Sequence, residues 1–149
     1  MQFIKSNIVE ETRGIILHSV NCQGVMGSGV ALALRKKWPI VYDRYLQIPT
    51  GEDSLGKLQI VPVGAELYVA NGFGQLYYGN DGKRYASITA IEHILDQTFR
   101  WCRDLDLPLK TVKIGCGLGG LDWALDVEPI FREMCKMFPM VDVMIYELG

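Results

Sequence analysis

Apolar runs of strand length alternate with helix-periodic runs along almost the whole chain. The clearest helix is predicted at 85–105, because its apolar residues recur at three- and four-residue spacing. These residues are Ile88, Ile91, Leu95, Phe99 and Cys102. Strands are predicted at 2–5, 14–20, 57–63, 66–71, 111–115 and 141–148, and further helices at 29–38, 40–48 and 126–138. This order predicts a three-layer α/β domain with a mixed, largely parallel central sheet.

Two glycine-rich segments, 24–29 and 115–120, each follow a predicted strand and precede a predicted helix. Ligands of open α/β sheets bind outside the carboxyl ends of the strands. Backbone N–H groups at the start of a helix also favour phosphate. Taken together, the two loops predict a clamp on a diphosphate, although either loop alone is also explained by a tight strand-to-helix turn.

The spacing within the two loops narrows the chemistry. The first has the G-x-x-x-x-G spacing of a phosphate loop at Gly24 and Gly29, but Val30 and Ala31 stand where that motif needs Lys and Ser or Thr. We therefore expect no nucleoside triphosphate hydrolysis. The second matches G-x-G-x-x-G late in the chain, whereas the dinucleotide fingerprint of an oxidoreductase opens its domain.

Length, charge and cysteine content exclude several classes of protein. The chain has 149 residues, which predicts one domain over 1–149. Its net charge is −2, so charge alone predicts no stable binding to nucleic acid. No signal peptide or membrane-spanning run is apparent, and a cytoplasmic protein is expected. Cys22, Cys102, Cys116 and Cys135 form no CxxC pair, so free thiols and no metal are predicted.

Single polar residues near the loops each allow two interpretations. Asn21 is either a turn residue that bonds its own backbone or a side chain aimed at a ligand hydroxyl. His18, on the preceding strand, is either a satisfied core histidine or a general base. Asp122 is either a structural carboxylate at a helix start or a general base. Asp126 is predicted to cap the helix that runs to Phe138, with Pro129 in its first turn.

Two motifs, "VNCQGVMGSGVALALRKKWP" and "KIGCGLGGLDWALDV", resemble the macro domain family of ADP-ribose-binding modules. The similarity is greater to the branch that contains terminal ADP-ribose protein glycohydrolase, yeast ADP-ribose-1''-phosphate phosphatase and the antitoxin that reverses DNA ADP-ribosylation. The "ANGFGQ" segment at 70–75 is similar to small phage and bacterial macro proteins. The resemblance implies an α/β/α macro domain that binds ADP-ribose or an ADP-ribosylated substrate and needs no cofactor.

The resemblance also implies roles for individual residues. Asn21 aligns with an asparagine that contacts the distal ribose, Asn7 and Ile8 stand in the adenine segment, and the loops hold the phosphates. The loop residues are Gly27, Ser28, Gly29 and Val30 in the first loop and Gly115, Cys116, Gly117, Leu118, Gly119 and Gly120 in the second. Tyr146 is a candidate for adenine stacking, and Phe73 and Lys83 are candidates near the distal ribose.

Two departures from the branch bear on catalysis. Its glycohydrolase uses a lysine and a second-loop aspartate; here no lysine follows Asn71 directly, and Gly119 takes the aspartate's place. The resemblance therefore implies ADP-ribose binding first. Beyond binding, it implies either hydrolysis of an ADP-ribose derivative, with phosphate or an ADP-ribosyl group removed, or a reader that binds without turnover. Asn21, Asp122 and His18 are the catalytic candidates.

Overall fold

The computed structural model describes residues 1–78 and 85–147. Six strands form one sheet in the order β1-β6-β5-β2-β4-β3. The strands are β1 (Gln2–Lys5), β2 (Gly14–Asn21), β3 (Leu58–Gly64), β4 (Leu67–Gln75), β5 (Leu109–Thr111) and β6 (Val143–Glu147). All neighbouring strands are parallel except β3, which pairs antiparallel with β4 at one edge. The mixed, largely parallel sheet is therefore confirmed.

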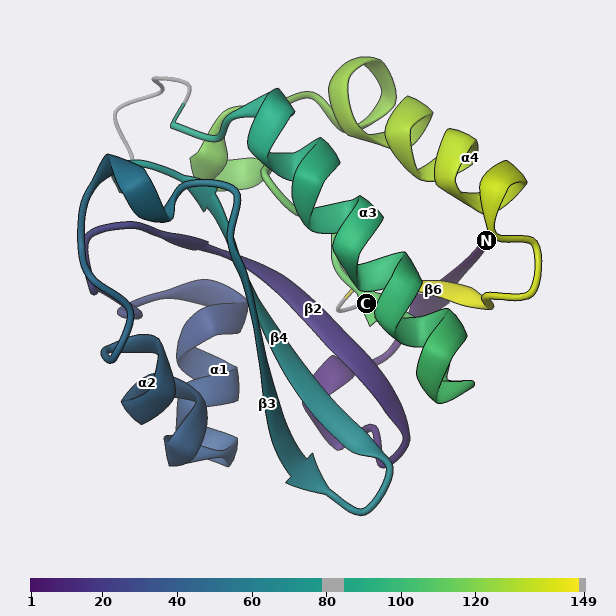
Figure 1. Ribbon diagram of the computed structural model, residues 1–149, viewed down its shortest axis with the longest axis horizontal. Helices are drawn as coiled ribbons and strands as arrows, with labels where there is room; N and C mark the ends of the chain where they lie inside the picture. Colours follow the sequence, from purple (N-terminus) through teal and green to yellow (C-terminus); the bar gives the residue numbers. More distant parts are fainter. Residues whose placement is uncertain (79–84, 148–149) are drawn as a thin grey trace.

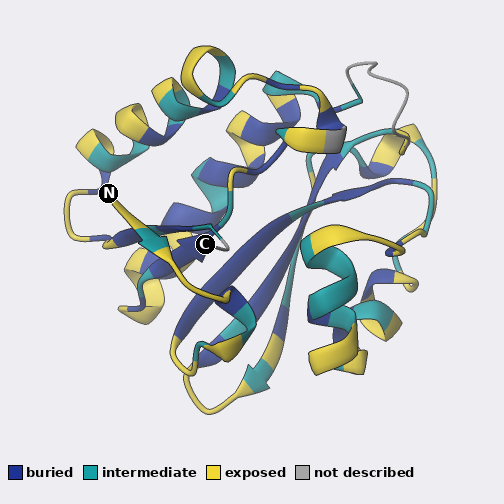
Figure 2. Cartoon of the chain, turned by 180° about the vertical axis from the view of Figure 1, so that it is seen from behind, coloured by how far each residue is buried: buried dark blue, intermediate teal, exposed yellow. Residues whose placement is uncertain are grey.

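Helices cover both faces of the sheet (Figure 1). The helix pair α1 (Gly29–Lys37) and α2 (Pro39–Tyr45) lies on one face, and α3 (Ile88–Leu105) and α4 (Glu128–Met137) lie on the other. The strands are mostly buried, while the outward faces of the helices are exposed (Figure 2). This arrangement is the three-layer architecture that the alternating pattern predicts.

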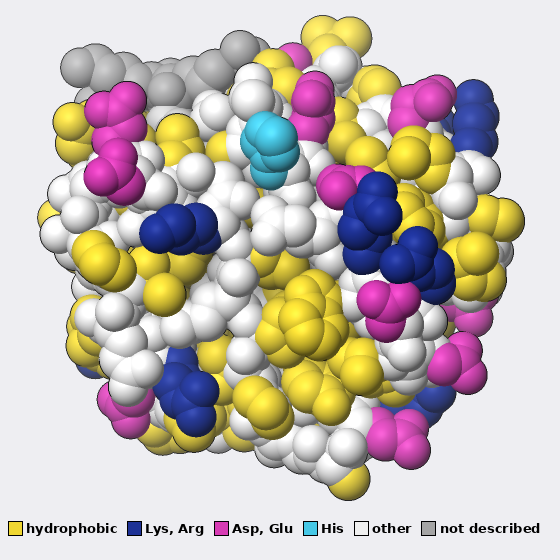
Figure 3. Space-filling view, viewed as in Figure 1, with side chains coloured by type: hydrophobic (Ala, Val, Ile, Leu, Met, Phe, Trp, Pro, Cys, Tyr) yellow, Lys and Arg dark blue, Asp and Glu magenta, His cyan; other side chains and the backbone are white. Residues whose placement is uncertain are grey.

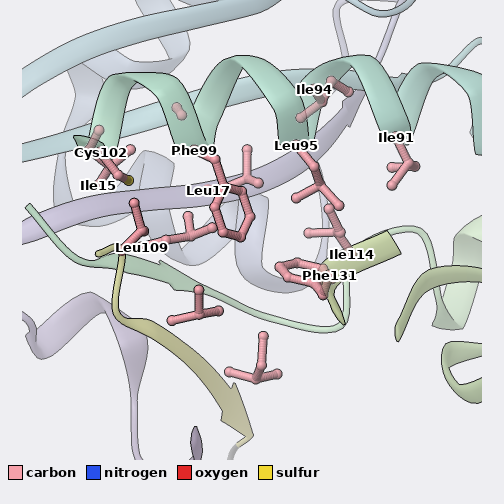
Figure 4. Packing of buried hydrophobic residues seen from close by; sticks show 14 of the residues in the cluster. Ile15, Leu17, Ile91, Ile94, Leu95, Phe99, Cys102, Leu109, Ile114 and Phe131 are labelled. Atoms are coloured by element: carbon pink, nitrogen blue, oxygen red, sulfur yellow. The ribbon is translucent and has the colours of Figure 1, made fainter. Parts of the chain in front are cut away.

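The core beneath α3 follows directly from its apolar spacing. Ser87 caps the helix by accepting a hydrogen bond from the Ala90 amide at 3.2 Å, and Asp106 ends it in the left-handed region. Leu95 and Phe99 lie over Leu17 of β2 (Figure 4), and all three are fully buried. Burial of each such side chain stabilises the fold by about 1.5–3 kcal/mol.

The strand predicted at 111–115 is wrong in position, because β5 spans Leu109–Thr111. The chain leaves the sheet after Thr111, where the Ile114 amide bonds the Val112 carbonyl oxygen at 2.8 Å and tightens the turn. Residues 112–116 then form a wall of the cavity described below instead of pairing with a strand.

The predicted start of the last helix is also wrong. A π-helical turn, Trp123–Val127, precedes α4, and its cap is Asp122, whose carboxylate accepts from the Leu125 amide at 2.9 Å. Asp126 instead accepts from the Asp122 amide at 2.8 Å. Pro129 does lie in the first turn of α4, where its missing N–H removes no helical bond.

Because β2, β4 and β5 run parallel, their carboxyl ends meet at one edge of the sheet. Asn21, Gln75 and the segment after Thr111 are thereby brought together there. In the part of the chain that the structure describes, no helix is long and apolar enough to cross a membrane. The four cysteines are free thiols.

Candidate ligand-binding site

A cavity of about 610 Å³ opens at this edge of the sheet. Residues 19–21 from β2 and 25–31 from the first glycine loop and α1 form one side. Residues 112–116 and Gly119 form the other side, and Gln75 and Tyr78 complete the lining. The sequence prediction that both glycine loops lie at one edge is therefore confirmed. The volume is in the range of small-molecule and cofactor sites.

Asn21 shapes the first loop from within. Its Oδ1 accepts from the Gln23 amide at 3.0 Å, and its Nδ2 donates to the Val25 carbonyl oxygen at 2.8 Å. These are the bonds of a turn residue, as the first interpretation of Asn21 predicts. Asn21 also lines the cavity, and only one of its two Nδ2 hydrogens is used in a hydrogen bond among the described residues.

Tyr45 of α2 contacts the same loop from the protein interior. Its hydroxyl lies 2.6 Å from the Asn21 carbonyl oxygen and 2.8 Å from Asn21 Oδ1, and it accepts from the amides of Gly24 and Val25, each at 3.1 Å. Burial raises the pKa of this phenol to about 12, so it remains protonated at neutral pH. Phe73 stacks against the Tyr45 ring at 5.6 Å.

The start of α1 offers free backbone donors to the cavity. Ser28, the N-cap, forms no side-chain cap bond, and the first helical bond runs from the Leu32 amide to the Ser28 carbonyl oxygen. The amides of residues 29–31 thus have no partner among the described residues. Gly29 has a φ of +59°, and an added Cβ would meet nothing within 4 Å. A ligand can approach this backbone closely.

The second loop is packed more tightly. The Gly119 carbonyl oxygen accepts from the amides of Tyr85 and Ala86 at 2.9 and 3.0 Å. A Cβ at Gly119 would lie 3.2 Å from the Ala86 Cβ and 3.3 Å from Gln75 Oε1. The backbone therefore leaves little room for the aspartate that the resemblance leads one to look for at position 119.

The titratable side chains that line the described cavity are Tyr78, Lys113 and Cys116. Lys113 lies 2.6 Å from the Glu147 carboxylate, which neutralises its charge. Burial raises the pKa of the Cys116 thiol, with nearby Asp122 adding to the effect, so the thiol is a poor nucleophile at neutral pH. No carboxylate or imidazole lines the part of the cavity that the structure describes.

His18 lies away from the cavity, on the face of β2 that α2 covers. It is fully buried, and its Nε2 faces Asn71 Oδ1 at 2.5 Å. The Asn71 amide nitrogen donates to Val41 and Gln59, so Oδ1 is the acceptor and Nε2 carries the proton. Burial lowers the pKa of His18 to about 4, and Nδ1 has no hydrogen-bond partner among the residues that the structure describes.

The remaining predicted site residues lie outside the cavity lining. Asp122 is the exposed cap described above, and Asn7 caps the short 3₁₀ helix Ile8–Glu10 by accepting from the Val9 amide. Ile8 and Phe73 are buried in the core beneath α1 and α2. Tyr146 is also buried there; burial, together with its hydrogen bond to Glu11, raises the pKa of its phenol.

Three predicted residues of the second loop also lie outside the cavity lining. Gly117 and Leu118 lie in the 3₁₀ turn Gly117–Gly119, and Gly120 ends that turn. Lys83 lies outside the described residues. Conversely, the sequence reasoning missed Tyr45 as a support of the first loop. The sequence indicates this role only by placing a tyrosine on the core-facing side of a predicted helix. A buried tyrosine needs a hydrogen-bond partner for its hydroxyl.

Comparison with known proteins agrees with this architecture. No protein-family model matches the chain. The macrodomain of Mycobacterium tuberculosis DarG matches with a TM-score of 0.82 and 23% identity, over 99% of this chain and 97% of that one. A Bacteroides thetaiotaomicron protein of unknown function is 30% identical with a TM-score of 0.83, over 99% of this chain and 97% of that one. The chain therefore has the macrodomain fold.

Two further relatives bear on ligands. The DNA ADP-ribosyl glycohydrolase of Mycobacterium tuberculosis is 30% identical over 136 residues, which cover 88% of this chain and 37% of that protein. Thermosipho africanus DarTG, solved in complex with ADP-ribose, matches with a TM-score of 0.72 and 20% identity over 97% of this chain and 40% of that one. The chain spans between 37% and 41% of the length of the curated relatives it matches.

Proposed function

We propose that the cavity binds ADP-ribose. The observation that carries this proposal is the convergence of two glycine loops, one from β2 and one after β5, on one cavity. The unpartnered amides of residues 29–31 begin a helix, where the backbone favours an anion. A similar fold, that of Thermosipho africanus DarTG, has been solved with ADP-ribose. The diphosphate lies between the two loops in this proposal.

The proposed reaction is removal of an ADP-ribosyl group, with nucleic acid as the favoured carrier. Support comes from the curated relatives named DNA ADP-ribosyl glycohydrolase. In the hydrolysis, the oxygen of a water molecule bonds to the anomeric carbon of the distal ribose. The bond from that carbon to the carrier breaks, its electron pair stays on the carrier atom, and that atom gains the proton that the water loses. Dephosphorylation of ADP-ribose 1''-phosphate, with the same ADP-ribose portion bound, remains the second reaction to test.

The residues at the cavity act in this proposal chiefly by position and by hydrogen bonds. The loop amides stabilise negative charge on the diphosphate, and the remaining Nδ2 hydrogen of Asn21 bonds a distal-ribose hydroxyl. Asp122 and His18 are not among the residues that line the described cavity, so in this proposal neither is expected to contact the reacting ribose. Catalysis in this proposal depends on a positioned water molecule; Lys83, a further candidate, lies outside the described residues.

A non-catalytic reader is the second candidate function. It is favoured by the absence of a carboxylate or imidazole from the described lining of the cavity. Such a protein holds ADP-ribose by the same loops but supplies no general base. The binding site is then unchanged, and turnover alone separates the two candidates.

Calorimetry with ADP-ribose, NAD and ATP tests the binding proposal. We expect ADP-ribose to bind more tightly than ATP, because the first loop lacks the lysine and hydroxyl that hold a triphosphate with magnesium. NAD shares the diphosphate but carries a nicotinamide on the distal ribose. An absence of ADP-ribose binding would refute the proposed function.

Turnover is tested with ADP-ribosylated DNA, ADP-ribosylated protein and ADP-ribose 1''-phosphate. Release from ADP-ribosylated DNA is expected, while release from none of the three supports the reader. Asn21→Ala frees the Gln23 amide and loosens the loop, so binding and turnover should fall together. Lys83→Ala tests a candidate outside the described residues, and Asp122→Asn tests a helix cap. A variant that loses turnover but keeps ADP-ribose binding would assign the catalytic role to the residue that it changes.

A further inference from the structure

Most lysines and arginines in the described part of the chain are neutralised by a carboxylate. The ion pairs are Arg13–Glu66, Arg100–Asp96, Arg103–Asp104, Lys110–Glu11, Lys113–Glu147, Arg132–Glu128 and Lys136–Glu133. Four of the cations without an ion pair lie on two helices that contact each other, at Arg35, Lys36 and Lys37 in the last turn of α1 and at Arg44 in α2. We call these four residues the basic face. Outside it, only Lys5 and Lys57 are unpaired among the described lysines and arginines.

Two side chains of the basic face, Arg35 and Lys37, contact aromatic rings instead of carboxylates. The Arg35 guanidinium lies 3.7 Å from the centroid of the Tyr42 ring, and its Nη1 donates to the Met26 carbonyl oxygen at 3.4 Å. Lys37 Nζ lies 5.9 Å from the centroid of the Trp38 ring. These contacts leave the charge of Arg35 and Lys37 without an opposite charge.

Few acids oppose this charge. Asp43 on α2 and Glu10 on the neighbouring 3₁₀ helix are exposed, and neither forms an ion pair with the basic face. Lys36, Lys37 and Arg44 are exposed to solvent. In Figure 3, dark blue atoms lie over the region of α1 and α2 at the lower left, next to magenta carboxylate atoms. A chain whose net charge is −2 thus presents a locally positive surface beside its proposed ligand site.

The basic face is continuous with the cavity through α1. This helix starts at Gly29, which lines the cavity, and Lys36 is seven residues further on. At 1.5 Å per residue, the two positions are about 10 Å apart. Each strand of a nucleic acid carries one phosphate about every 3.4 Å of helix axis, so this distance spans roughly three nucleotides.

We propose that the basic face binds the phosphate backbone of a nucleic acid whose ADP-ribosylated base is held at the cavity. The proposal rests on ADP-ribose binding in the cavity. Lys36, Lys37 and Arg44 contact phosphates on one side of the modified nucleotide, and Arg35 links them to the first loop. Four cations are too few for tight binding of unmodified nucleic acid, so the face adds affinity only when ADP-ribose anchors the strand.

The test compares free ADP-ribose with a short single-stranded oligodeoxynucleotide that carries one ADP-ribosylated base. The Lys36→Gln, Lys37→Gln, Arg44→Gln triple variant removes three charges from exposed positions. We expect its affinity for the modified oligodeoxynucleotide to fall at least about tenfold at low salt, with the affinity for free ADP-ribose unchanged. The slope of log affinity against log salt should fall by about 2.

A matched variant removes three charges elsewhere, by Arg100→Gln, Arg132→Gln and Lys136→Gln on α3 and α4. It should bind the modified oligodeoxynucleotide like the wild type. An equal loss in both variants, or no loss in the first, would overturn the basic face as the binding surface. The basic face would also be overturned as a nucleic-acid-binding surface if the three charges raised the affinity for an ADP-ribosylated neutral peptide by the same factor. Failure of the wild type to bind free ADP-ribose would instead refute the proposed function itself.

Discussion

Tyr45 is a buried residue whose hydroxyl determines the shape of the first glycine loop. It contacts Asn21 and the amides of Gly24 and Val25, while its ring packs on Phe73. A phosphate loop of the nucleoside triphosphate type is organised around a lysine and a metal ion. Here a phenol with a pKa of about 12 supports the loop from the protein interior, so the loop is shaped before any ligand arrives.

Tyr45→Phe removes only this hydroxyl. It removes the hydroxyl that the Gly24 amide and the Asn21 carbonyl oxygen contact, and it leaves the Val25 amide only a bond of 3.4 Å to Asn21 Oδ1. Loss of such partners costs about 1–3 kcal/mol when the groups stay buried. We expect ADP-ribose affinity to fall about fivefold to tenfold by calorimetry, with the fold retained. Tyr42→Phe on the same helix is the control and should bind like the wild type. Unchanged affinity in Tyr45→Phe would show that the loop keeps its shape without the phenol.

At the scale of elements, α3 approaches β4 so closely that the strand needs glycine. A Cβ at Gly74 would lie 2.3 Å from Ser19 Oγ and 2.8 Å from Ile91 Cδ1. Gly74→Ala should lower the free energy of unfolding by about 1–3 kcal/mol in chemical denaturation. Gly27→Ala, whose Cβ would meet only Val25 at 3.8 Å, should leave stability unchanged. Equal stability of both variants would contradict the close packing.

The element boundaries show which local signals predict structure and which do not. The helix 85–105 is predicted well because its apolar stripe and its cap, Ser87, agree. Strand β5 is shorter than predicted because "TVKIG" is apolar for another reason, since Val112 and Ile114 line a cavity instead of a sheet. The choice between Asp122 and Asp126 as cap depends on a π-helical turn, which no periodicity in the sequence indicates.

At the scale of the whole molecule, His18 couples stability to pH. Its folded pKa of about 4 is below the ordinary value of 6.5, so the unfolded chain binds the proton more readily. The contribution of His18 to the free energy of unfolding should therefore be largest above about pH 6.5. It should fall towards pH 4, by up to about 3 kcal/mol. Denaturation curves between pH 7 and pH 4.5 measure this decline. His18→Gln should flatten it, and His93→Gln, at the exposed surface of α3, should not.

The site as a whole was predictable only where it is made of backbone. The two glycine loops are local patterns at strand ends, and parallel strands bring such ends together. Side-chain candidates were harder, because Asp122 and His18 are polar residues near the loops in sequence but not at the cavity. Their partners, Leu125 and Asn71, are known only once the chain is folded. The same holds for Tyr45, which reaches the loop across 20 and more residues.

The tie between Gly119 and the start of α3 has a consequence for hydrogen exchange. The amides of Tyr85 and Ala86 both donate to the Gly119 carbonyl oxygen, and the Ser87 amide donates to the Gly74 carbonyl oxygen. A ligand that steadies the second loop also steadies the amides of Tyr85 and Ala86. Their deuterium uptake should therefore slow when ADP-ribose is added, which makes the beginning of α3 a native reporter of cavity occupancy.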